Sequence, residues 1–289
     1  MSLSSRPLYL LAGPTASGKS AKALNWAEQT GGDILNADSM QLYADVPILT
    51  ARPDAVETAR APHHLYGHLD GQTLWSTGDW LRAARPFIAE ALNGGPPLCI
   101  VGGTGLYFNA LVHGLAEIPD IDEAVRTEAR AAWQDMGEEK LRDLLKQHDP
   151  QAEARIMPND QQRLSRAYEV WLQTGRSLTN WQTHTVPELP AGSYELDILY
   201  PDRAWLYDRC DRRLQIMLDH GALDEVRALM AKGLAPDWPI MRVLGLSEFV
   251  AFLNGKMTLD GALALARQKT RNYAKRQSTW FRNQFKQPE

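Results

Sequence analysis

Residues 13–20, with the sequence GPTASGKS, constrain the fold of this chain more than any other feature. They match the pattern G-x-x-x-x-G-K-[ST] of a phosphate-binding loop, whose backbone N–H groups surround phosphate oxygens at the start of a helix. The pattern needs a strand before the loop and a helix after it. The apolar run Leu8–Ala12 predicts the strand, and residues 20–29 predict the helix. This context disfavours a chance match in a glycine-rich turn, so the loop predicts a bound phosphorylated ligand.

The pattern also assigns roles within the loop. Lys19 is expected to hold the distal phosphates, and the Ser20 hydroxyl is expected to ligate a Mg²⁺ ion. Such loops are common in ATP-binding and other nucleotide-binding proteins, and the loop alone does not identify which phosphate compound it holds. The residues expected to bind the diphosphate or nucleotide are Gly13, Pro14, Thr15, Ala16, Ser17, Gly18, Lys19 and Ser20.

Composition limits the class of protein. The chain has 289 residues, of which 44% are hydrophobic and 23% are charged, as in an ordinary soluble globular protein of one large domain or two. Its two cysteines, Cys99 and Cys210, lie far apart in sequence, which disfavours a disulfide framework or a zinc site and indicates a reducing compartment. No apolar run approaches the ~20 residues of a membrane span. We therefore expect a cytoplasmic protein that does not enter a membrane.

The order of the predicted elements indicates an α/β fold. Strand candidates at Leu8–Ala12, Asp33–Asn36 and residues 98–101 alternate with helical segments such as residues 79–92. Strands that alternate with helices predict a parallel, doubly wound sheet flanked by helices.

The middle of the chain has a different pattern. Residues 122–181 are almost entirely helical, a proline-rich stretch follows, and strand character returns at residues 194–200. We therefore predict a phosphate-loop core formed by residues 1–120 and 187–289. A small all-helical domain, residues 121–186, is predicted to be inserted into it.

Two further loops are expected at the phosphate site, because ligands bind at the carboxyl ends of the strands in open parallel sheets. Asp38 follows one strand and could act as a general base, bind Mg²⁺ or only cap the next helix. Gly102-Gly103-Thr104 follows another strand. Its glycines would let the backbone approach a ligand, and the Thr104 hydroxyl is expected to point at the same phosphates. A plain strand-to-helix turn is the alternative.

An absence in the sequence narrows the function. Phosphate-loop ATPases and GTPases usually need an Asp at the end of a second apolar strand to hold water and Mg²⁺. Here that strand ends in Gly102-Gly103-Thr104, and the sequence has no Asn-Lys-x-Asp guanine reader. Motor and switch functions are therefore disfavoured.

Basic residues are concentrated near the C-terminus although the net charge is −4. Residues 262–287 contain no acidic residue, and aromatic residues lie between the cations. This is typical of a face that binds a polyanion, and a solvated amphipathic helix is the alternative. The cations are Arg267, Lys269, Arg271, Lys275, Arg276, Arg282 and Lys286.

Two more groups of arginines are candidates for anion binding. Arg163 and Arg166 share a helix face and could contact phosphate, or Arg166 could pair with Glu169 within the helix. At least one of three arginines at helical spacing could face an anionic ligand, and the best candidate is Arg209. The three are Arg203, Arg209 and Arg213.

Seven motifs in this order resemble those of the tRNA dimethylallyltransferase family, also called the tRNA isopentenyltransferase family. They are GPTASGKS, DSMQLY at residues 38–43, GGTGLY at 102–107, NDQQRLSRAYEV at 159–170, RAWLYDRCDRR at 203–213, MRVLGLSEF at 241–249 and TRNYAKRQSTWFR at 270–282. The resemblance covers nearly the whole chain.

The resemblance implies a function. Members transfer a dimethylallyl group from its diphosphate to N6 of the adenosine just 3′ of the tRNA anticodon (position 37). The loop would then hold dimethylallyl diphosphate with Mg²⁺, and we expect a monomer that binds the anticodon stem–loop. The implied catalytic residues are Asp38, Thr104, Lys19 and Arg209. The implied tRNA-binding residues are Asp38, Ser39, Met40, Gln41, Thr104, Arg126, Gln162, Arg163, Leu164, Ser165, Arg166, Arg242, Lys275 and Arg276.

Two other functions remain open from the residues. One is a small-molecule kinase, which also uses a phosphate loop in an α/β core. The other is a non-catalytic, ATP-dependent switch that binds RNA. Measurements of ATP hydrolysis and of nucleotide affinity would distinguish the kinase and the switch from the transferase.

Overall fold

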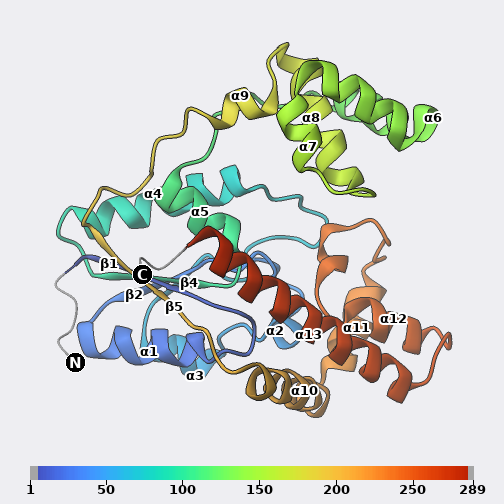
Figure 1. The fold of residues 1–289 in the computed structure, drawn as a ribbon. Coiled ribbons are helices and arrows are strands. Elements are labelled where there is room, and N and C mark those ends of the chain that lie inside the picture. The colour runs from blue at the N-terminus through green and yellow to red at the C-terminus, as the bar shows by residue number, and fades with distance from the viewer. Residues whose placement is uncertain (1–5, 286–289) are drawn as a thin grey trace. The chain divides into compact units, whose positions relative to one another are not determined.

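The computed structural model describes residues 6–285 and divides the chain into two units (Figure 1). The first unit combines the residues up to Leu111 with those from Leu189 onward, and the second is Val112–Glu188. The first is built around a β-sheet and the second around a cluster of helices. Each is described by itself.

The sheet of the first unit is parallel throughout its described strands, with the order β3-β2-β4-β1-β5. The strands are β1 (Leu8–Ala12), β2 (Asp33–Asn36), β3 (His63–His64), β4 (Leu98–Gly102) and β5 (Tyr194–Ile198). This sheet confirms the predicted fold class. The sequence did not predict β3, because two residues are too few to show a period of alternation.

Helices cover both faces of the sheet, as Figure 1 shows. On one face lie α1 (Lys19–Thr30) and α3 (Ala55–Arg60), and on the other lie α4 (Thr77–Leu92) and α5 (Gly105–His113). Every residue of β1 and β4 is buried as a result. Strands covered on both faces need apolar side chains at every position, which is why they read as continuous apolar runs in the sequence.

Helix α4 anchors the carboxyl end of β2. It begins after Ser76, whose hydroxyl accepts the N–H of Asp79 while the Asp79 carboxylate accepts the N–H of Ser76, a capping box. Trp80 is fully buried, donates its indole N–H to the Asn36 carbonyl at 2.8 Å and stacks on Tyr107 with ring centroids 4.3 Å apart. The end of β2 is thereby held where the site residues follow it.

The C-terminal part of the first unit is helical. Helix α13 (Leu259–Gln284) packs against α10 (Arg203–Asp219) and α12 (Leu246–Leu253). It buries one stripe of residues spaced three or four apart, so its opposite side faces solvent. The shorter helices of this unit are α2 (Pro47–Thr50), α11 (Ala222–Ala231) and the 3₁₀ helix η1 (Pro239–Arg242).

The second unit has an apolar core of its own. It is enclosed by α6 (Glu123–His148), α7 (Pro150–Arg155), α8 (Gln161–Thr174) and α9 (Leu178–Gln182). Gly137, with φ 75°, interrupts α6. A left-handed backbone at this position suits glycine, which has no Cβ.

The second unit begins earlier and ends later than the predicted residues 121–186. The Thr185 hydroxyl donates to the His113 carbonyl at 2.8 Å, and a Cβ on Gly114 would lie 2.3 Å from the Val186 oxygen. The chain segments that enter and leave the insertion are therefore in contact and belong to it. A pattern of helical residues does not reveal a contact between two extended segments.

No helix within residues 6–285 is both long enough and apolar enough to cross a membrane.

Replacing Gly102 by alanine should destabilise the fold. A Cβ there would lie 2.0 Å from the Ala37 oxygen, and this neighbour is backbone next to β2, which cannot swing aside as a side chain can. We expect Gly102→Ala to lower the free energy of unfolding by about 3 kcal/mol, measured by urea denaturation. Gly261→Ala is the control, because its Cβ would meet only the Thr258 hydroxyl at 3.2 Å. Equal stability of the two variants would contradict the close approach.

Candidate active site

Three loops meet at the carboxyl edge of the sheet, because β2, β4 and β1 are parallel neighbours. We name them the phosphate loop (residues 13–20, after β1), the Asp38 turn (residues 37–41, after β2) and the Gly103 turn (residues 102–105, which begins at the last residue of β4). The Thr104 N–H donates to the Ala37 carbonyl at 3.1 Å and joins the last two. The structure therefore brings together the three segments that the sequence placed at one site.

The phosphate loop has the backbone of an anion-binding turn. Gly18 (φ 90°) and Ala16 (φ 62°) are left-handed, which is uncommon for a residue with a side chain such as Ala16. Gly18 is also the N-cap of α1, so the N–H groups that follow it carry the positive end of the helix dipole.

Two amides of this loop already have partners. The Ser17 N–H donates to the Pro14 carbonyl at 3.3 Å, and the Thr15 N–H donates to Gln277 Oε1 at 2.8 Å. The expectation that amides all along residues 13–20 hold the phosphate is therefore too broad. The N–H groups at the start of α1 are better placed for that role.

Two arginines of α10 hold the phosphate loop. Arg213 Nη2 donates to Thr15 Oγ1 at 2.6 Å, and Arg209 Nε donates to the Ala16 carbonyl at 2.9 Å. Arg213 Nε is buried without a hydrogen-bond partner among the described residues, and burial lowers the pKa of this guanidinium. A buried N–H group without a partner marks a position where an anion oxygen would fit.

These contacts change the ranking of the three candidate arginines. The sequence favoured Arg209, which is exposed and lies over the Trp205 ring, 4.7 Å from its centroid. Arg213 is less exposed and belongs with Arg209 as a candidate. Arg203 is exposed and donates to the Tyr207 hydroxyl at 3.0 Å, away from the loop.

Lys19, Asp38 and Arg213 form one charged cluster. Burial lowers the pKa of Lys19 to about 8, while the charge of Asp38 opposes this shift and the charge of Arg213 adds to it. The charge of Asp38 likewise opposes the effect of burial on the pKa of Arg213. Lys19 Nζ also donates to the Pro14 carbonyl at 3.1 Å. A cation whose pKa is lowered in this way gains from the arrival of an anion.

Buried Asn36 positions Asp38. Asn36 Oδ1 accepts the Asp38 N–H at 2.8 Å, and Asn36 Nδ2 donates to the Asp38 carbonyl at 3.0 Å and to the Leu65 carbonyl at 2.9 Å. Asp38 Oδ1 accepts the N–H of half-buried Met40 at 3.1 Å and closes a turn. No described helix begins here, so the helix-cap alternative is wrong. Asp38 Oδ2 has no hydrogen-bond partner among the described residues, which leaves it for a ligand.

Thr104 connects the Gly103 turn to the Asp38 turn. Its Oγ1 accepts the Ser39 N–H at 2.9 Å and donates to Ser39 Oγ at 3.2 Å. In this structure the Thr104 hydroxyl therefore lies against Ser39, and its contact with the phosphates stays a prediction. Gln41 Nε2 donates to the Thr50 and Ala51 carbonyls at 2.9 Å each, so only its side-chain oxygen remains for a nucleotide.

A side chain of α13 joins the phosphate loop to the Gly103 turn. Gln277 Oε1 accepts the Thr15 N–H and its Nε2 donates to the Gly103 carbonyl, both at 2.8 Å. A Cβ on Gly105 would lie 2.1 Å from the Trp280 indole. The sequence assigned Gly102 and Gly103 to a close approach of ligand. In the structure Gly102 lies against the Ala37 backbone and Gly103 makes room for the Gln277 carboxamide.

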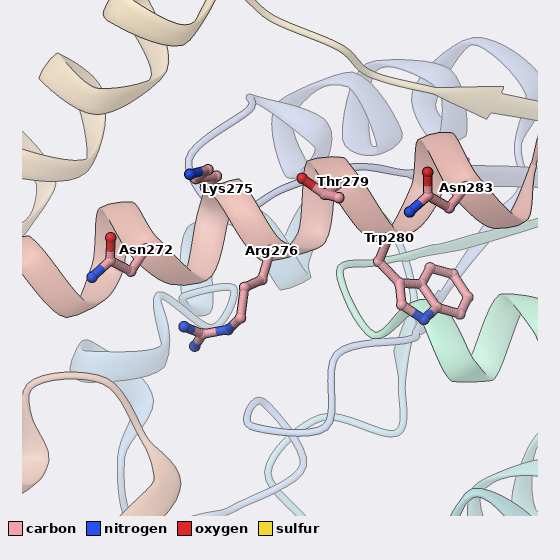
Figure 2. A pocket seen from close by; sticks show the side chains of 6 residues that line it. All are labelled: Asn272, Lys275, Arg276, Thr279, Trp280 and Asn283. Carbon is pink, nitrogen blue, oxygen red and sulfur yellow. The ribbon is translucent and has the colours of Figure 1, made fainter. Parts of the chain in front are cut away.

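Two cavities lie beside these contacts. One, of about 220 Å³, has aromatic and apolar walls that include Leu106, Tyr273 and Trp280, and polar walls that include Ser39 and Thr104. The other, of about 460 Å³, lies along the outer face of α13 (Figure 2). Figure 2 shows Arg276 and Trp280 projecting to the same side of this helix. Both residues line both cavities, so the site and the outer face of α13 are adjacent.

Four of the six cations of α13 fall into two groups. Lys269 bonds to the buried carboxylate of Glu248, and Arg271 bonds to Asp211 at 2.6 Å, so these two stabilise the packing of α13. Lys275 and Arg276 are exposed on the outer face. The predicted polyanion-binding segment is therefore reduced to part of the helix. Its last cation, Lys286, lies outside the described residues.

In the second unit, the predicted RNA contacts of α8 are divided between core and surface. Leu164 is fully buried and Ser165 is 7% exposed. Their side chains pack inside the unit, so the predicted RNA contacts by these two side chains are wrong. Gln162 is exposed and stays a candidate.

The remaining predicted RNA-binding arginines are at the surface. Three of them pair with a carboxylate three residues away, at 3.3 to 3.7 Å, and exposed pairs of this kind contribute little stability. Breaking these ion pairs so that the arginines could contact a phosphate would therefore cost little free energy. The pairs are Arg126–Glu123, Arg163–Asp160 and Arg166–Glu169. In the first unit, Arg242 is exposed at the end of η1.

Sequence reasoning missed Asn36 and Gln277 as site residues. Both are polar residues in positions that an apolar pattern predicts to be buried: Asn36 ends β2, and Gln277 lies on the buried stripe of α13. A buried polar side chain almost always has a hydrogen-bond partner. This mismatch of residue type and position was the signal that could have found them.

The fold and the site define a class of protein. It is an α/β protein with a phosphate-loop motif, in which a carboxylate and two partly buried cations lie near one another, without the Asp after β4 that nucleotide hydrolysis usually needs.

Comparison with known families identifies the group within this class. The model described as IPP transferase matches residues 41–284, and that described as isopentenyl transferase matches residues 6–64. The tRNA dimethylallyltransferases of Caulobacter sp. (strain K31) and Phenylobacterium zucineum (strain HLK1) are 53% and 52% identical over 277 and 278 residues, 96% of this chain and 90% of each relative. The chain therefore belongs to the IPP transferase family, that of the tRNA dimethylallyltransferases, as its motifs predict.

Solved structures agree with this assignment. The full-length tRNA isopentenylpyrophosphate transferase from Bacillus halodurans has a TM-score of 0.66 and 36% identity, over 96% of this chain and 86% of that one. A eukaryotic dimethylallyltransferase acting on tRNA has a TM-score of 0.82 and 26% identity, over 95% of this chain and 69% of that one.

Inorganic pyrophosphate should bind less tightly as the pH rises above about 8. The charged form of Lys19 attracts the anion, and its pKa of about 8 in the free protein rises when the anion is bound, so binding takes up a proton. Affinity should therefore change little near pH 7 and fall by up to about tenfold per pH unit above pH 8. Isothermal titration calorimetry measures this.

Lys19→Met is the control, because it removes the titrating group. It should bind pyrophosphate weakly, with the same affinity on both sides of pH 8. A wild-type affinity that does not change across this range would contradict the lowered pKa of Lys19.

Proposed function

We propose that this protein transfers a dimethylallyl group from dimethylallyl diphosphate to N6 of the adenosine 3′ of the anticodon (position 37) in tRNA. The family membership and the names of the relatives support this reaction. The observation that carries it is the cluster of Lys19, Asp38 and Arg213. Lys19 and Arg213 bond to the phosphate loop, which lies with the Asp38 turn at the carboxyl edge of the sheet. A carboxylate that can take a proton from an amine lies in the same site as cations that can hold a diphosphate.

The reaction needs both halves of this cluster. The bond from the prenyl carbon to the diphosphate oxygen breaks, N6 forms a bond to that carbon, and N6 loses a proton. Negative charge grows on the departing diphosphate, and donors already directed at it lower the barrier. Lys19, Arg213 and the N–H groups at the start of α1 are these donors, and Asp38 Oδ2 accepts the proton.

The nearby cavity suits the acceptor base. Tyr273 and Trp280 give it aromatic walls, and the Asp38 turn borders it through Ser39. Single-stranded RNA loops are commonly recognised by stacking of splayed bases on aromatic side chains, and enzymes that modify a base take it out of the stack. An adenine turned out of the anticodon loop would reach Asp38 from this side.

Magnesium would accompany the diphosphate. Among residues 6–285, no group of three or more acidic, His or Cys side chains could hold a metal ion. Mg²⁺ often takes few protein ligands and completes its shell with phosphate oxygens and water. The exposed Ser20 hydroxyl in the first turn of α1 fits this mode. When bound, the ion would supply positive charge to the diphosphate.

Mass spectrometry of tRNA tests the function. We expect tRNA incubated with the protein, Mg²⁺ and dimethylallyl diphosphate to gain one dimethylallyl group on an adenosine and to release pyrophosphate. We propose that the protein does this as a monomer in the cytoplasm. Turnover of ATP without this gain would favour a small-molecule kinase, and ATP-dependent RNA binding without turnover would favour a switch.

Asp38→Asn should lower the turnover number by about 10²–10⁴-fold, because a general base contributes about that factor. Asparagine keeps the shape and can still accept the Met40 N–H, so the turn should persist while proton transfer fails. Single-turnover rates at saturating tRNA, measured across a Mg²⁺ series, give the result. Activity restored by excess Mg²⁺ would mean that Asp38 mainly binds the metal.

Asp70→Asn is the matched control. Asp70 Oδ1 accepts the N–H of Gln72 at 2.9 Å, the same local turn as at Asp38, and it is exposed. It should turn over at the wild-type rate. If Asp38→Asn did so too, Asp38 would only hold its turn.

Binding of tRNA should weaken with salt despite the acidic net charge of −4. Each phosphate contact releases counterions, which gives a slope of about −0.7 to −0.9 in log affinity against log salt. Replacing exposed Lys275 and Arg276 together by Gln should flatten the slope by about two contacts. The control pair, Arg227→Gln with Lys256→Gln, removes two exposed cations from outside α13. Equal slopes for the two pairs would contradict RNA binding on α13.

A further inference from the structure

We propose that Gln277 is a positioning residue that sets the distance between the diphosphate and the acceptor nucleotide, a role that rests on the proposed function. Its side chain spans two parts of the site. Oε1 accepts the Thr15 N–H of the phosphate loop, and Nε2 donates to the Gly103 carbonyl, each at 2.8 Å. The Gly103 turn continues to Thr104, whose hydroxyl holds Ser39 beside Asp38.

The burial of Gln277 makes this link specific to a carboxamide. The side chain is 6% exposed, and each end meets the complementary backbone group, an N–H at its oxygen and a C=O at its nitrogen. A carboxamide can satisfy both groups at once, whereas an apolar side chain of the same size would leave both without a partner.

The Gly103 turn is shaped to receive this side chain. A Cβ on Gly103 would lie 2.2 Å from Gln277 Nε2 and 3.3 Å from the Gly13 carbonyl oxygen. A glycine at this position therefore lets the carboxamide enter between the phosphate loop and the turn. The contact joins residues 262 positions apart in the chain, so it exists only when α13 is docked.

The nucleic-acid face of α13 is on other residues. Lys275 and Arg276 are exposed, and Arg276 projects with Trp280 into the outer cavity (Figure 2). A substitution at Gln277 should therefore change the geometry of the site while the proposed RNA contacts remain.

Gln277→Glu tests the link through its own protonation. The ionised carboxylate still accepts the Thr15 N–H but offers no donor to the Gly103 carbonyl. The protonated carboxyl has an O–H that restores this donor, and burial next to a carbonyl raises the pKa of such a group toward the accessible range. Gln277→Met has a similar size and neither donor nor acceptor at any pH.

The measurement is the affinity for inorganic pyrophosphate with Mg²⁺, relative to wild type at each pH from about 5.5 to 8.5. We expect Gln277→Glu to lose about tenfold at the alkaline end and to recover at the acid end, and Gln277→Met to be weak throughout. The titratable and charged groups around residue 277 are the same in every variant, so the ratio isolates that residue. They are Lys19 and Arg213 beside the phosphate loop, Asp38, and Tyr273 and Arg276 on α13.

A kinetic measurement separates positioning from packing. At the alkaline end, Gln277→Glu should lower kcat by about ten- to a hundredfold while KM for tRNA stays within about twofold, because the RNA face is intact. Gln268→Glu, an exposed change on the same helix, is the control for pyrophosphate affinity and should match wild type at each pH.

Three results would overturn the proposal. If both Gln277 variants bound pyrophosphate with nearly the wild-type affinity, Gln277 would contribute only to packing. If Gln277→Glu bound pyrophosphate equally weakly at both ends of the pH range, loss of the hydrogen bond to the Gly103 carbonyl would not be the cause of the lower affinity. Unfolding of the Glu variant at alkaline pH, seen by circular dichroism, would show that Gln277 holds the fold and not the site.

The comparison across pH is made within one protein, so it stands even if Gln277→Met does not fold. Pyrophosphate binding needs no tRNA, so it is also independent of the transfer assay. A wild-type protein that does not prenylate tRNA would overturn the proposed function, while the pH signature of Gln277→Glu would still report the link. If the wild type prenylates tRNA but the affinity of Gln277→Glu does not change with pH, the role of Gln277 is overturned and the proposed function stands.

Discussion

The site depends on the parallel pairing of β1 with β4 on one side and β5 on the other. The register pairs Ala12 with Gly102, so the phosphate loop and the Gly103 turn leave the sheet side by side. On the far side of β4, the end of β2 brings the Asp38 turn to the same edge. Because helices bury both faces of these strands, their side chains must be apolar, and the polar chemistry is confined to the loops that follow them.

The electrostatics of that edge suit the displacement of a diphosphate. Burial disfavours the charge on Lys19 and on Arg213, and the Asp38 charge opposes this effect at both. A bound anion would also stabilise the charged forms of Lys19 and Arg213, so the free site favours a negatively charged ligand. The β4 strand ends in Gly-Gly-Thr without a carboxylate that could hold a hydrolytic water, which agrees with transfer to an acceptor other than water.

Helix α13 serves two purposes with its two sides. Its buried stripe carries Gln277 into the site, and Lys269 and Arg271 tie it to Glu248 and Asp211. The outer face keeps Lys275 and Arg276 exposed. The acidic net charge of the chain therefore does not describe this surface, because the distribution of charge decides where a polyanion can bind.

The sequence by itself determined the phosphate loop, the α/β class, and strands β1 and β2 to the residue. These features follow from local patterns: apolar runs, helical spacing, and the backbone freedom of glycine. Only the tertiary structure decided that Arg213 contacts Thr15, that the Thr104 hydroxyl turns to Ser39, that Leu164 is buried, and that Gln277 enters the site. Such contacts join residues that are far apart in the chain or lie on different sides of one helix. No local pattern records them, because they arise only when whole elements pack against each other.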